Sequence, residues 1–221
     1  MSRVAMVLGA TGLVGNALTE ELLSRAGWAE VRVLVRRPLA LEYPKLKQTV
    51  VDWEQLSQYK EQFQGVDAVF CCLGTTIKKA GSQSEFERVD LQYPLEAAAL
   101  AKDHGVKQFL AVSSIGANAK SRSFYPRTKG RTEDGLIAVG FQGLHLFRPS
   151  LLLGKREEFR LGERVASRVM KALDFMMVGK AAKYRGIPAT IVARAMVNIA
   201  LADTHGVHIY TNEVIHVIGE R

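Results

Sequence analysis

A tyrosine and a lysine four residues apart, Tyr125 and Lys129, are the side chains of this 221-residue sequence whose spacing most directly suggests chemistry. Residues four apart lie on one face of a helix, so a phenol and an ammonium group would be neighbours. The positive charge favours the phenolate form of the tyrosine. Such a tyrosine can give a proton to a carbonyl oxygen while hydride reaches the carbon, or take the proton in the reverse direction.

The geometry of this pair depends on the next residue, Pro126. Proline suits only the first turn of a helix and disfavours helical geometry in the residue before it. We therefore expect Tyr125 at the cap of a helix over about 124–138. The alternative to a catalytic pair is a packing tyrosine beside a surface lysine.

A pair of serines is expected opposite the tyrosine. The apolar run "VKQFLAVSS" (106–114) predicts a buried strand that ends in Ser113 and Ser114. A serine hydroxyl at this position can hold the oxygen on which the tyrosine acts. We expect Ser114 in this role, with Ser113 as the near alternative, and Ser113 is also an expected cofactor contact.

Three glycines at spacings of three lie near the start of the chain, in "VLGATGLVG" (7–15). They follow an apolar run over 3–10 and precede a stretch of helical periodicity over 13–27, the context of a phosphate-binding turn. Glycines there permit a tight turn, a close approach of the backbone to a pyrophosphate, and close packing of the helix. The alternative is a glycine-rich turn without a ligand. The expected cofactor contacts are Gly9, Thr11, Gly12, Leu13, Val14 and Gly15.

The second predicted strand, "EVRVLVRRP" (30–38), ends in two arginines where NAD-binding folds usually carry an acid. Guanidinium groups suit phosphate, so Arg36 and Arg37 favour NADP(H) over NAD by binding its 2′-phosphate. The alternative is two solvated surface arginines.

Further cofactor contacts are expected where the third and fourth strands end. Asp52, in "KQTVVDW" (47–53), is interpreted either as an acceptor for the adenine amino group or as the N-cap of the next helix. After the predicted strand 67–74, the residues expected beside the nicotinamide half are Leu73, Gly74 and Thr75. The adjacent Cys71 and Cys72 are more typical of small buried residues than of redox centres.

Strands and helices alternate along the sequence, which predicts an α/β fold: a Rossmann-like, doubly wound parallel sheet with helices on both faces. Beyond the segments above, the pattern predicts a long helix over 84–105, a sixth strand over 143–150, helices around 160–177 and 188–203, and a final strand or strand pair over 207–218. We expect one domain, 1–221, with a cofactor-binding core over 1–154 and a small cap over 155–221. Within that cap, 155–173 could close over a substrate or form an amphipathic surface helix.

Composition limits the function classes. The chain is 48% hydrophobic and 24% charged, with no apolar run near the roughly 20 residues that span a bilayer. No secretory signal pattern or metal-ligand spacing is visible, and the two adjacent cysteines favour a reducing, cytoplasmic location. The net charge of +8 favours anionic partners, but the positive residues are dispersed, so we expect no nucleic acid and no membrane as partner.

The motifs GATGLVG, VRRP, CLGTT, VSS, YPRTK and RPS, in this order, resemble the short-chain dehydrogenase/reductase superfamily. The pattern is similar to its extended or atypical members, and in particular to the Tat-interacting-protein oxidoreductase group and its bacterial relatives. The resemblance implies that Tyr125 is the acid/base, that Lys129 binds the nicotinamide ribose and tunes the tyrosine, and that Ser114 orients the substrate.

The resemblance adds two positions. Arg148 and Pro149 match the family's "RP" after the sixth strand, where the backbone borders the nicotinamide pocket; Arg148 has a structural role as its alternative. Asp90 lies near where many relatives carry an asparagine in a proton relay, which weakens such a relay here.

The sequence thus predicts an NADP(H)-dependent oxidoreductase that acts on a small carbonyl or alcohol. The alternative from another class is a non-catalytic NADP(H)-binding regulator or scaffold, similar to the Tat-interacting group and to NmrA-like sensors. A nucleic-acid-binding protein and an epimerase or dehydratase are weaker alternatives. The substrate, a protein partner and a homo-oligomeric state stay open.

Overall fold

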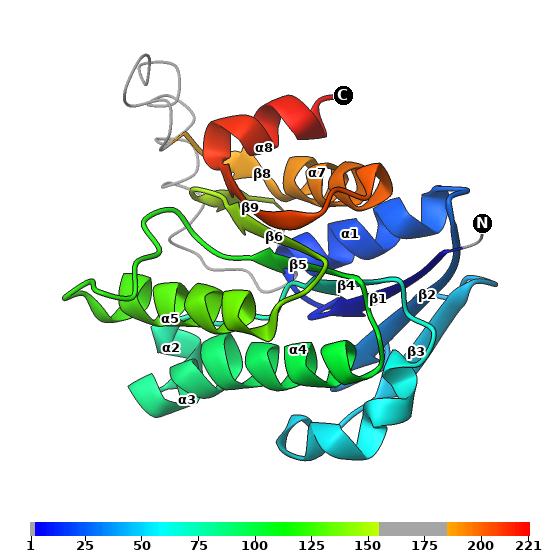
Figure 1. The fold of residues 1–221 in the computed structure, drawn as a ribbon, viewed down its shortest axis with the longest axis horizontal. Coiled ribbons are helices and arrows are strands. Elements are labelled where there is room, and N and C mark those ends of the chain that lie inside the picture. Colours follow the sequence, from blue (N-terminus) through cyan, green and yellow to red (C-terminus); the bar gives the residue numbers. More distant parts are fainter. Residues whose placement is uncertain (1–2, 155–184) are drawn as a thin grey trace.

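The protein has at its centre a seven-stranded parallel sheet, described here from a computed structural model that covers residues 3–154 and 185–221 (Figure 1). The strand order is β3-β2-β1-β4-β5-β6-β9, and every neighbouring pair is parallel. This is the doubly wound order with one strand added, so the predicted Rossmann-like fold is confirmed. The strands are β1 (Arg3–Leu8), β2 (Trp28–Val35), β3 (Leu46–Val50), β4 (Ala68–Cys71), β5 (Gln108–Val112), β6 (Gly143–Arg148) and β9 (Gly206–Thr211).

Helices cover both faces of the sheet. Helices α1, α7 and α8 lie on one face, and α4 and α5 lie on the other with the short α2 and α3 beside them (Figure 1). A 3-10 segment follows β3, a π-helical turn separates α3 from α4, and a two-stranded pair, β7 and β8, lies apart from the main sheet. The bounds are α1 (Leu13–Ser24), the 3-10 segment (Trp53–Phe63), α2 (Ile77–Ala80), α3 (Gln83–Glu87), the π turn (Arg88–Gln92), α4 (Tyr93–Asp103), α5 (Phe124–Val139), β7 (Leu152–Leu153), β8 (Ile187–Pro188), α7 (Ala189–Ala202) and α8 (Asn212–Gly219).

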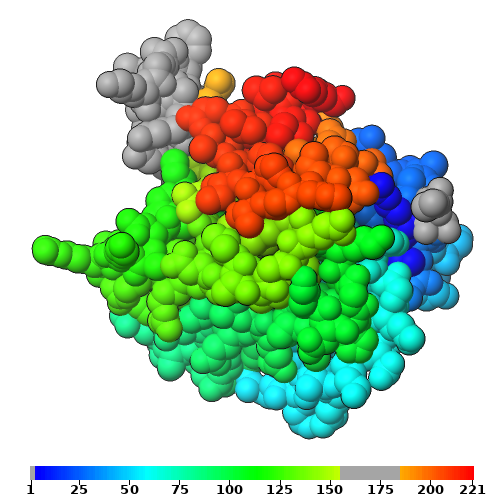
Figure 2. Space-filling model, viewed as in Figure 1, coloured from blue at the N-terminus to red at the C-terminus, as the bar shows by residue number. Residues whose placement is uncertain are grey.

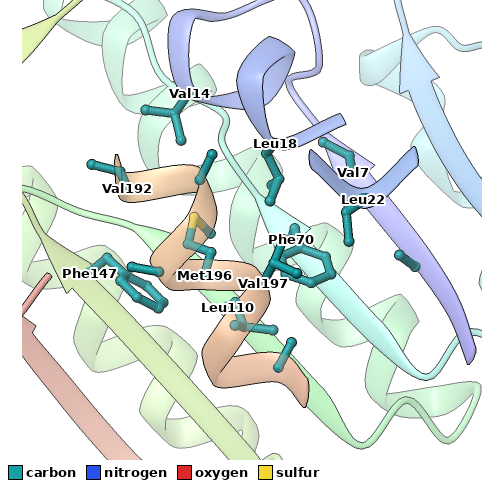
Figure 3. Close-up of a cluster of buried hydrophobic side chains, with 14 of the residues drawn as sticks. Val7, Val14, Leu18, Leu22, Phe70, Leu110, Phe147, Val192, Met196 and Val197 are labelled. Atoms are coloured by element: carbon teal, nitrogen blue, oxygen red, sulfur yellow. The ribbon is translucent and has the colours of Figure 1, made fainter. Parts of the chain in front are cut away.

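Both faces of the central strands are buried, which explains why their sequences are nearly continuous apolar runs. In β1, Val7 belongs to the core beneath α1 and α7, whereas Met6 and Leu8 belong to the core beneath α4 and α5. Figure 3 shows Leu18 of α1 and Met196 of α7 in the cluster that covers the first of these faces. The sheet therefore holds its carboxyl edge rigidly between two packed layers.

The helix expected over 84–105 is interrupted. The π turn Arg88–Gln92 separates α3 from α4, and Pro94 lies in the first turn of α4. A π turn adds one residue to the helical repeat, and such turns are frequent at functional sites. Here it carries the buried Asp90. The expected end of the helix is confirmed, because Gly105 has a φ of +76° directly after the last turn.

Two helix ends differ from expectation. Helix α1 ends at Ser24 rather than at Gly27, since Arg25 already has extended geometry. Tyr125 is not a cap: Ser123 is the N-cap of α5, and Tyr125 is the second helical residue. Pro126 is still within the first turn, where its missing N–H has no intrahelical partner to lose.

The C-terminal residues contribute to the sheet and to one of its layers, so the expectation of a small cap over 155–221 is corrected for the part that the structure describes. Strand β9 pairs with β6, and α7 packs beside α1. Figure 2 shows the C-terminal residues, orange to red, gathered on one side of the molecule. Of the final strand or strand pair expected over 207–218, the structure has the single strand β9, and the helix α8 follows it. Its Ile215 is fully buried against the core.

Two expectations fall outside the described residues. These are the helix around 160–177 and the alternatives for 155–173.

The pairing of β6 with β9 buries a histidine and predicts a pH dependence of stability. His145 is fully buried; its ring stacks on that of His208 with 5.3 Å between centroids, and its Nδ1 lies 3.1 Å from Tyr210 Oη. Burial, together with His208, lowers the pKa of His145 from 6.5 to about 4. The unfolded chain therefore binds more protons between these values. We expect the free energy of unfolding to fall by about 3 kcal/mol as the pH drops from 6.5 to 4.

Urea unfolding at a series of pH values measures this effect. His145→Gln should remove that part of the slope, whereas His205→Gln, which changes an exposed histidine, should keep it. An unchanged slope in His145→Gln would contradict the assignment.

Candidate cofactor and catalytic site

The glycine turn between β1 and α1 brings three backbone segments into contact. Gly9 has a φ of +85°, and a Cβ on it would lie 2.6 Å from the carbonyl oxygen of Cys72. A Cβ on Gly15 would lie 2.1 Å from the carbonyl oxygen of Gly9. Side chains are therefore excluded at both positions, as the predicted tight turn and close helix packing require.

The first turn of α1 is open to an anion. Its N-cap, Gly12, is exposed and provides no side-chain cap for the helix. The N–H of Gly12 bonds to the carbonyl oxygen of Gly9 at 3.0 Å, and no side chain of the N-cap accepts the N–H groups at the start of α1. Backbone N–H groups at a helix N-terminus suit phosphate, and Thr11, Leu13 and Val14 flank this surface. The turn therefore fits a pyrophosphate.

The two arginines lie after β2, next to the glycine turn in the sheet order. Arg36 and Arg37 are exposed, and within the described chain neither makes a hydrogen bond or ion pair. Asp52 is the N-cap of the 3-10 segment; its Oδ1 accepts the N–H of Glu54 and its Oδ2 accepts the side-chain amide of Gln55, each at 3.0 Å. The helix-cap interpretation thus accounts for both oxygens of Asp52.

A buried ion pair lies where β4 and β5 end. The Nζ of Lys129 on α5 is 2.7 Å from Oδ1 of Asp90, and the two side chains are 8% and 1% exposed. The Oδ2 of Asp90 accepts the N–H of Thr75 at 2.8 Å. A Cβ on Gly74 would lie 3.9 Å from the Lys129 nitrogen, so the backbone after Leu73 passes beside the pair. Asp90 therefore connects the loop after β4 to α5.

The charge of Lys129 is maintained by this partner. Burial alone would lower the pKa of Lys129. The Asp90 carboxylate raises it, and Tyr125 raises it further. The net result is a pKa above the usual value of 10.5. The ammonium group is therefore charged at neutral pH although it is nearly inaccessible to water.

Tyr125 lies one helical turn before Lys129, at the mouth of the site. It is 41% exposed, and its ring packs against that of the buried Phe86 with 5.7 Å between centroids. No hydrogen bond joins Tyr125 to Lys129 within the described chain. The packing fixes the ring at an exposed position, and the phenol is available to a ligand.

The two serines after β5 have different partners. Ser113 donates a hydrogen bond to the Glu133 carboxylate, whereas Ser114 donates only to the carbonyl of Ile115, at 3.2 Å. Successive residues of a strand point to opposite faces, and Ser113 takes the α5 face. The hydroxyl of Ser113 is therefore occupied by its bond to α5, and Ser114 lies at the end of the strand.

Glu133 is the functional position that the motifs did not predict. It is 3% exposed and lies one turn beyond Lys129 on α5. Its carboxylate accepts the Nε–H of Arg148 at 2.9 Å and a second bond from the same guanidinium, which raises the pKa of Arg148. The i, i+4 spacing of Lys129 and Glu133 was the available signal. Arg148 therefore takes its alternative, structural role, while Pro149 accepts the N–H of Ile115 at 2.9 Å.

Some of these residues line one small pocket between the ends of β4 and β5 and the helices α4 and α5. Its lining includes Asp90, Ser113, Lys129 and Glu133. Cys71 also lines it, and burial raises the pKa of its thiol to about 11, which favours the inert thiol over the reactive thiolate. The predicted Lys129 and the loop 73–75 thus meet at one place, whereas Asp52 and the arginines lie after the outer strands β3 and β2.

Comparison with known proteins agrees with this geometry. A family described as NAD(P)H-binding matches residues 9–140. Protein HTATIP2 of Rattus norvegicus is 38% identical over 99% of this chain and 90% of its own length. Protein FMP52, mitochondrial, of Debaryomyces hansenii is 32% identical over 90% of this chain and 87% of its own length. The chain therefore belongs to the NAD(P)H-binding family, and the predicted likeness to the Tat-interacting group is confirmed.

Solved structures show the same fold at low identity. MoeE5 in complex with UDP-glucose and NAD gives a TM-score of 0.72 with 19% identity, covering 98% of this chain and 81% of that one. The oxidoreductase ylbE from Lactococcus lactis gives 0.66 with 17% identity, covering 99% and 97%. The fold is thus that of NAD(P)-binding oxidoreductases and their relatives.

The expected cytoplasmic location is wrong on this comparison. Several relatives, from Debaryomyces hansenii, Candida albicans and Aspergillus clavatus, carry the name FMP52, mitochondrial. The adjacent cysteines on which the expectation rested report a reducing environment and do not distinguish compartments. In residues 3–154 and 185–221, no helix has the length and apolar character needed to cross a membrane.

The ion pairs of Glu133 with Arg148 and of Glu87 with Arg131 should contribute differently to the free energy of unfolding. Glu133→Gln leaves the guanidinium of Arg148 without its buried partner, and we expect a loss of about 3 kcal/mol or more. Glu87→Gln breaks a pair with Arg131 whose side chains are 31% and 49% exposed, and we expect a loss below about 1 kcal/mol. Urea unfolding of both variants measures the difference. Equal losses would show that the Glu133 pair does not hold the site together.

Proposed function

We propose that the protein is an NADP(H)-dependent oxidoreductase that acts on a small carbonyl or alcohol. The observation that carries the proposal is the convergence of three strand ends. The glycine turn follows β1, the loop with Gly74 follows β4, and Ser114 follows β5; these strands are adjacent and parallel in the sheet. A ligand that binds at the glycine turn can therefore extend to Lys129. Ligands bind at this edge in doubly wound sheets.

Each part of the cofactor has residues that suit it. The backbone of the turn around Gly9 and Gly12 suits the pyrophosphate, and the free guanidinium groups of Arg36 and Arg37 suit a 2′-phosphate. Lys129 suits the hydroxyl groups of the nicotinamide ribose, as the family resemblance implies. When bound, the cofactor supplies or accepts the hydride.

The residues around the reacting centre would transfer the proton that accompanies the hydride. Tyr125 would donate its phenolic proton to the carbonyl oxygen during reduction and take it back during oxidation. The Ser114 hydroxyl would donate a hydrogen bond to the same oxygen. The family resemblance implies that Lys129, one helical turn away, assists the tyrosine in this role.

A non-catalytic role is the second candidate, and two observations favour it. Tyr125 is directed to the mouth of the site by Phe86 and is not hydrogen-bonded to Lys129 within the described chain. The charge of Lys129 is also already paired with Asp90. In this case the protein would bind NADP(H), and the state of the bound cofactor would decide whether a protein partner is recruited. We propose no nucleic-acid or membrane partner for either candidate.

Cofactor binding is the first test. NADPH at a concentration 100-fold above its Kd should stabilise the protein by about 2.7 kcal/mol and raise its melting temperature, and NADH at the same concentration should do so much less. Replacing both Arg36 and Arg37 by alanine should bring the two cofactors to the same level. Arg221→Ala, at the exposed end of the chain, should change neither. No shift with NADPH in the unaltered protein would contradict the proposal.

Turnover separates the two candidates. A panel of small aldehydes and ketones, followed by the loss of NADPH absorbance, should include a substrate for the unaltered protein. Tyr125→Phe should lower the rate by a factor of about 100 or more and keep NADPH binding, since it removes only the proton donor. An undiminished rate in Tyr125→Phe would contradict the role of the tyrosine. Binding of NADPH without turnover on any substrate would favour the non-catalytic candidate.

A further inference from the structure

Asp90 contacts both sides of the nicotinamide end of the proposed site. Its Oδ1 is 2.7 Å from Lys129 Nζ on α5, and its Oδ2 accepts the N–H of Thr75 in the loop after β4. Thr132 reinforces the arrangement, because its hydroxyl donates to the backbone carbonyl of Asp90 at 2.8 Å. The carboxylate therefore fixes the position of the lysine and of the loop together.

The same contact decides the net charge of the site. The ammonium of Lys129 and the carboxylate of Asp90 are both almost fully buried, so water screens neither of them effectively. The third charged residue of the pocket lining, the buried Glu133, pairs with Arg148, whose side chain is 29% exposed. In the part of the chain that the structure describes, each charged residue of the lining thus has a partner of opposite charge.

The cofactor has a different charge in its two redox states. The oxidised nicotinamide ring is a cation, and the reduced ring is neutral. An uncompensated ammonium beside the ring would repel the oxidised form only, and the low local dielectric would strengthen this effect. Gly74 lies directly beside the pair, since a Cβ on it would be 3.5 Å from Asp90 Oδ1 and 3.9 Å from Lys129 Nζ, so the loop expected beside the nicotinamide contacts both charged groups.

We propose that Asp90 is a positioning residue that holds Lys129 and the Thr75 loop and, by cancelling the lysine charge, allows the site to bind oxidised NADP⁺ without a penalty relative to NADPH. The inference rests on the proposed cofactor site and concerns binding, so it holds for either candidate function. Asp90 acts through Lys129, since its own side chain is 1% exposed.

The ratio of two dissociation constants tests the charge effect. NADPH binding is measured by its fluorescence, and NADP⁺ binding by competition with NADPH. Asp90→Asn keeps the size of the side chain and removes the charge, so the Kd of NADP⁺ should rise on the order of tenfold more than the Kd of NADPH. Glu87→Gln, which changes a partly exposed carboxylate three residues earlier, should leave the ratio unchanged. A purely structural role would weaken both forms by the same factor and would overturn the proposal.

A second variant keeps the test valid if Asp90→Asn does not fold. Lys129→Met leaves the Asp90 charge without its partner, so the ratio should move in the opposite direction, with NADPH weakened more than NADP⁺. An unchanged ratio in this variant would also overturn the inference. Failure of the unaltered protein to bind either cofactor would instead contradict the proposed function, and this inference with it.

Discussion

The buried ion pair between Asp90 and Lys129 is the interaction on which the candidate site depends. Removing two charges from water is costly, and the cost is recovered only where partners and hydrogen bonds are well placed. Here the carboxylate of Asp90 lies in the π turn and the ammonium of Lys129 lies on α5. The N–H of Thr75 donates to the second carboxylate oxygen. The interruption between α3 and α4, an irregularity in the fold, is therefore what connects the loop after β4 to the helix with the tyrosine.

A backbone constraint aligns the cofactor end of the same site. A Cβ on Gly9 would lie only 2.6 Å from the carbonyl oxygen of Cys72, and a Cβ on Gly15 only 2.1 Å from the carbonyl oxygen of Gly9. Because the chain after β4 contacts the glycine turn directly, the pyrophosphate surface and the loop 73–75 form one continuous edge. The two layers of helices hold this edge, since α1 packs with α7 on one face and α4 with α5 on the other.

Much of this organisation was predictable because it depends on local patterns. Continuous apolar runs identified the strands of the sheet, and the glycine spacing identified the turn after β1. The sequence did not reveal what depends on contacts between distant segments. The π turn places Asp90 against Lys129, the hydroxyl of Ser113 is bonded to Glu133, and Ile215 of α8 packs into the core. The effect of Pro126 was misjudged for a local reason, since Ser123 is the N-cap and Pro126 still lies within the first turn.

A crystal structure with NADP⁺ bound tests the central claim most directly, because it measures where the cofactor lies relative to the two ends of the site. We expect the pyrophosphate against the backbone of residues 9–15 and a hydroxyl of the nicotinamide ribose within about 3.2 Å of Lys129 Nζ, with the Asp90 contact to the lysine preserved. A cofactor bound elsewhere, or a nicotinamide ribose that makes no contact with Lys129, would contradict it.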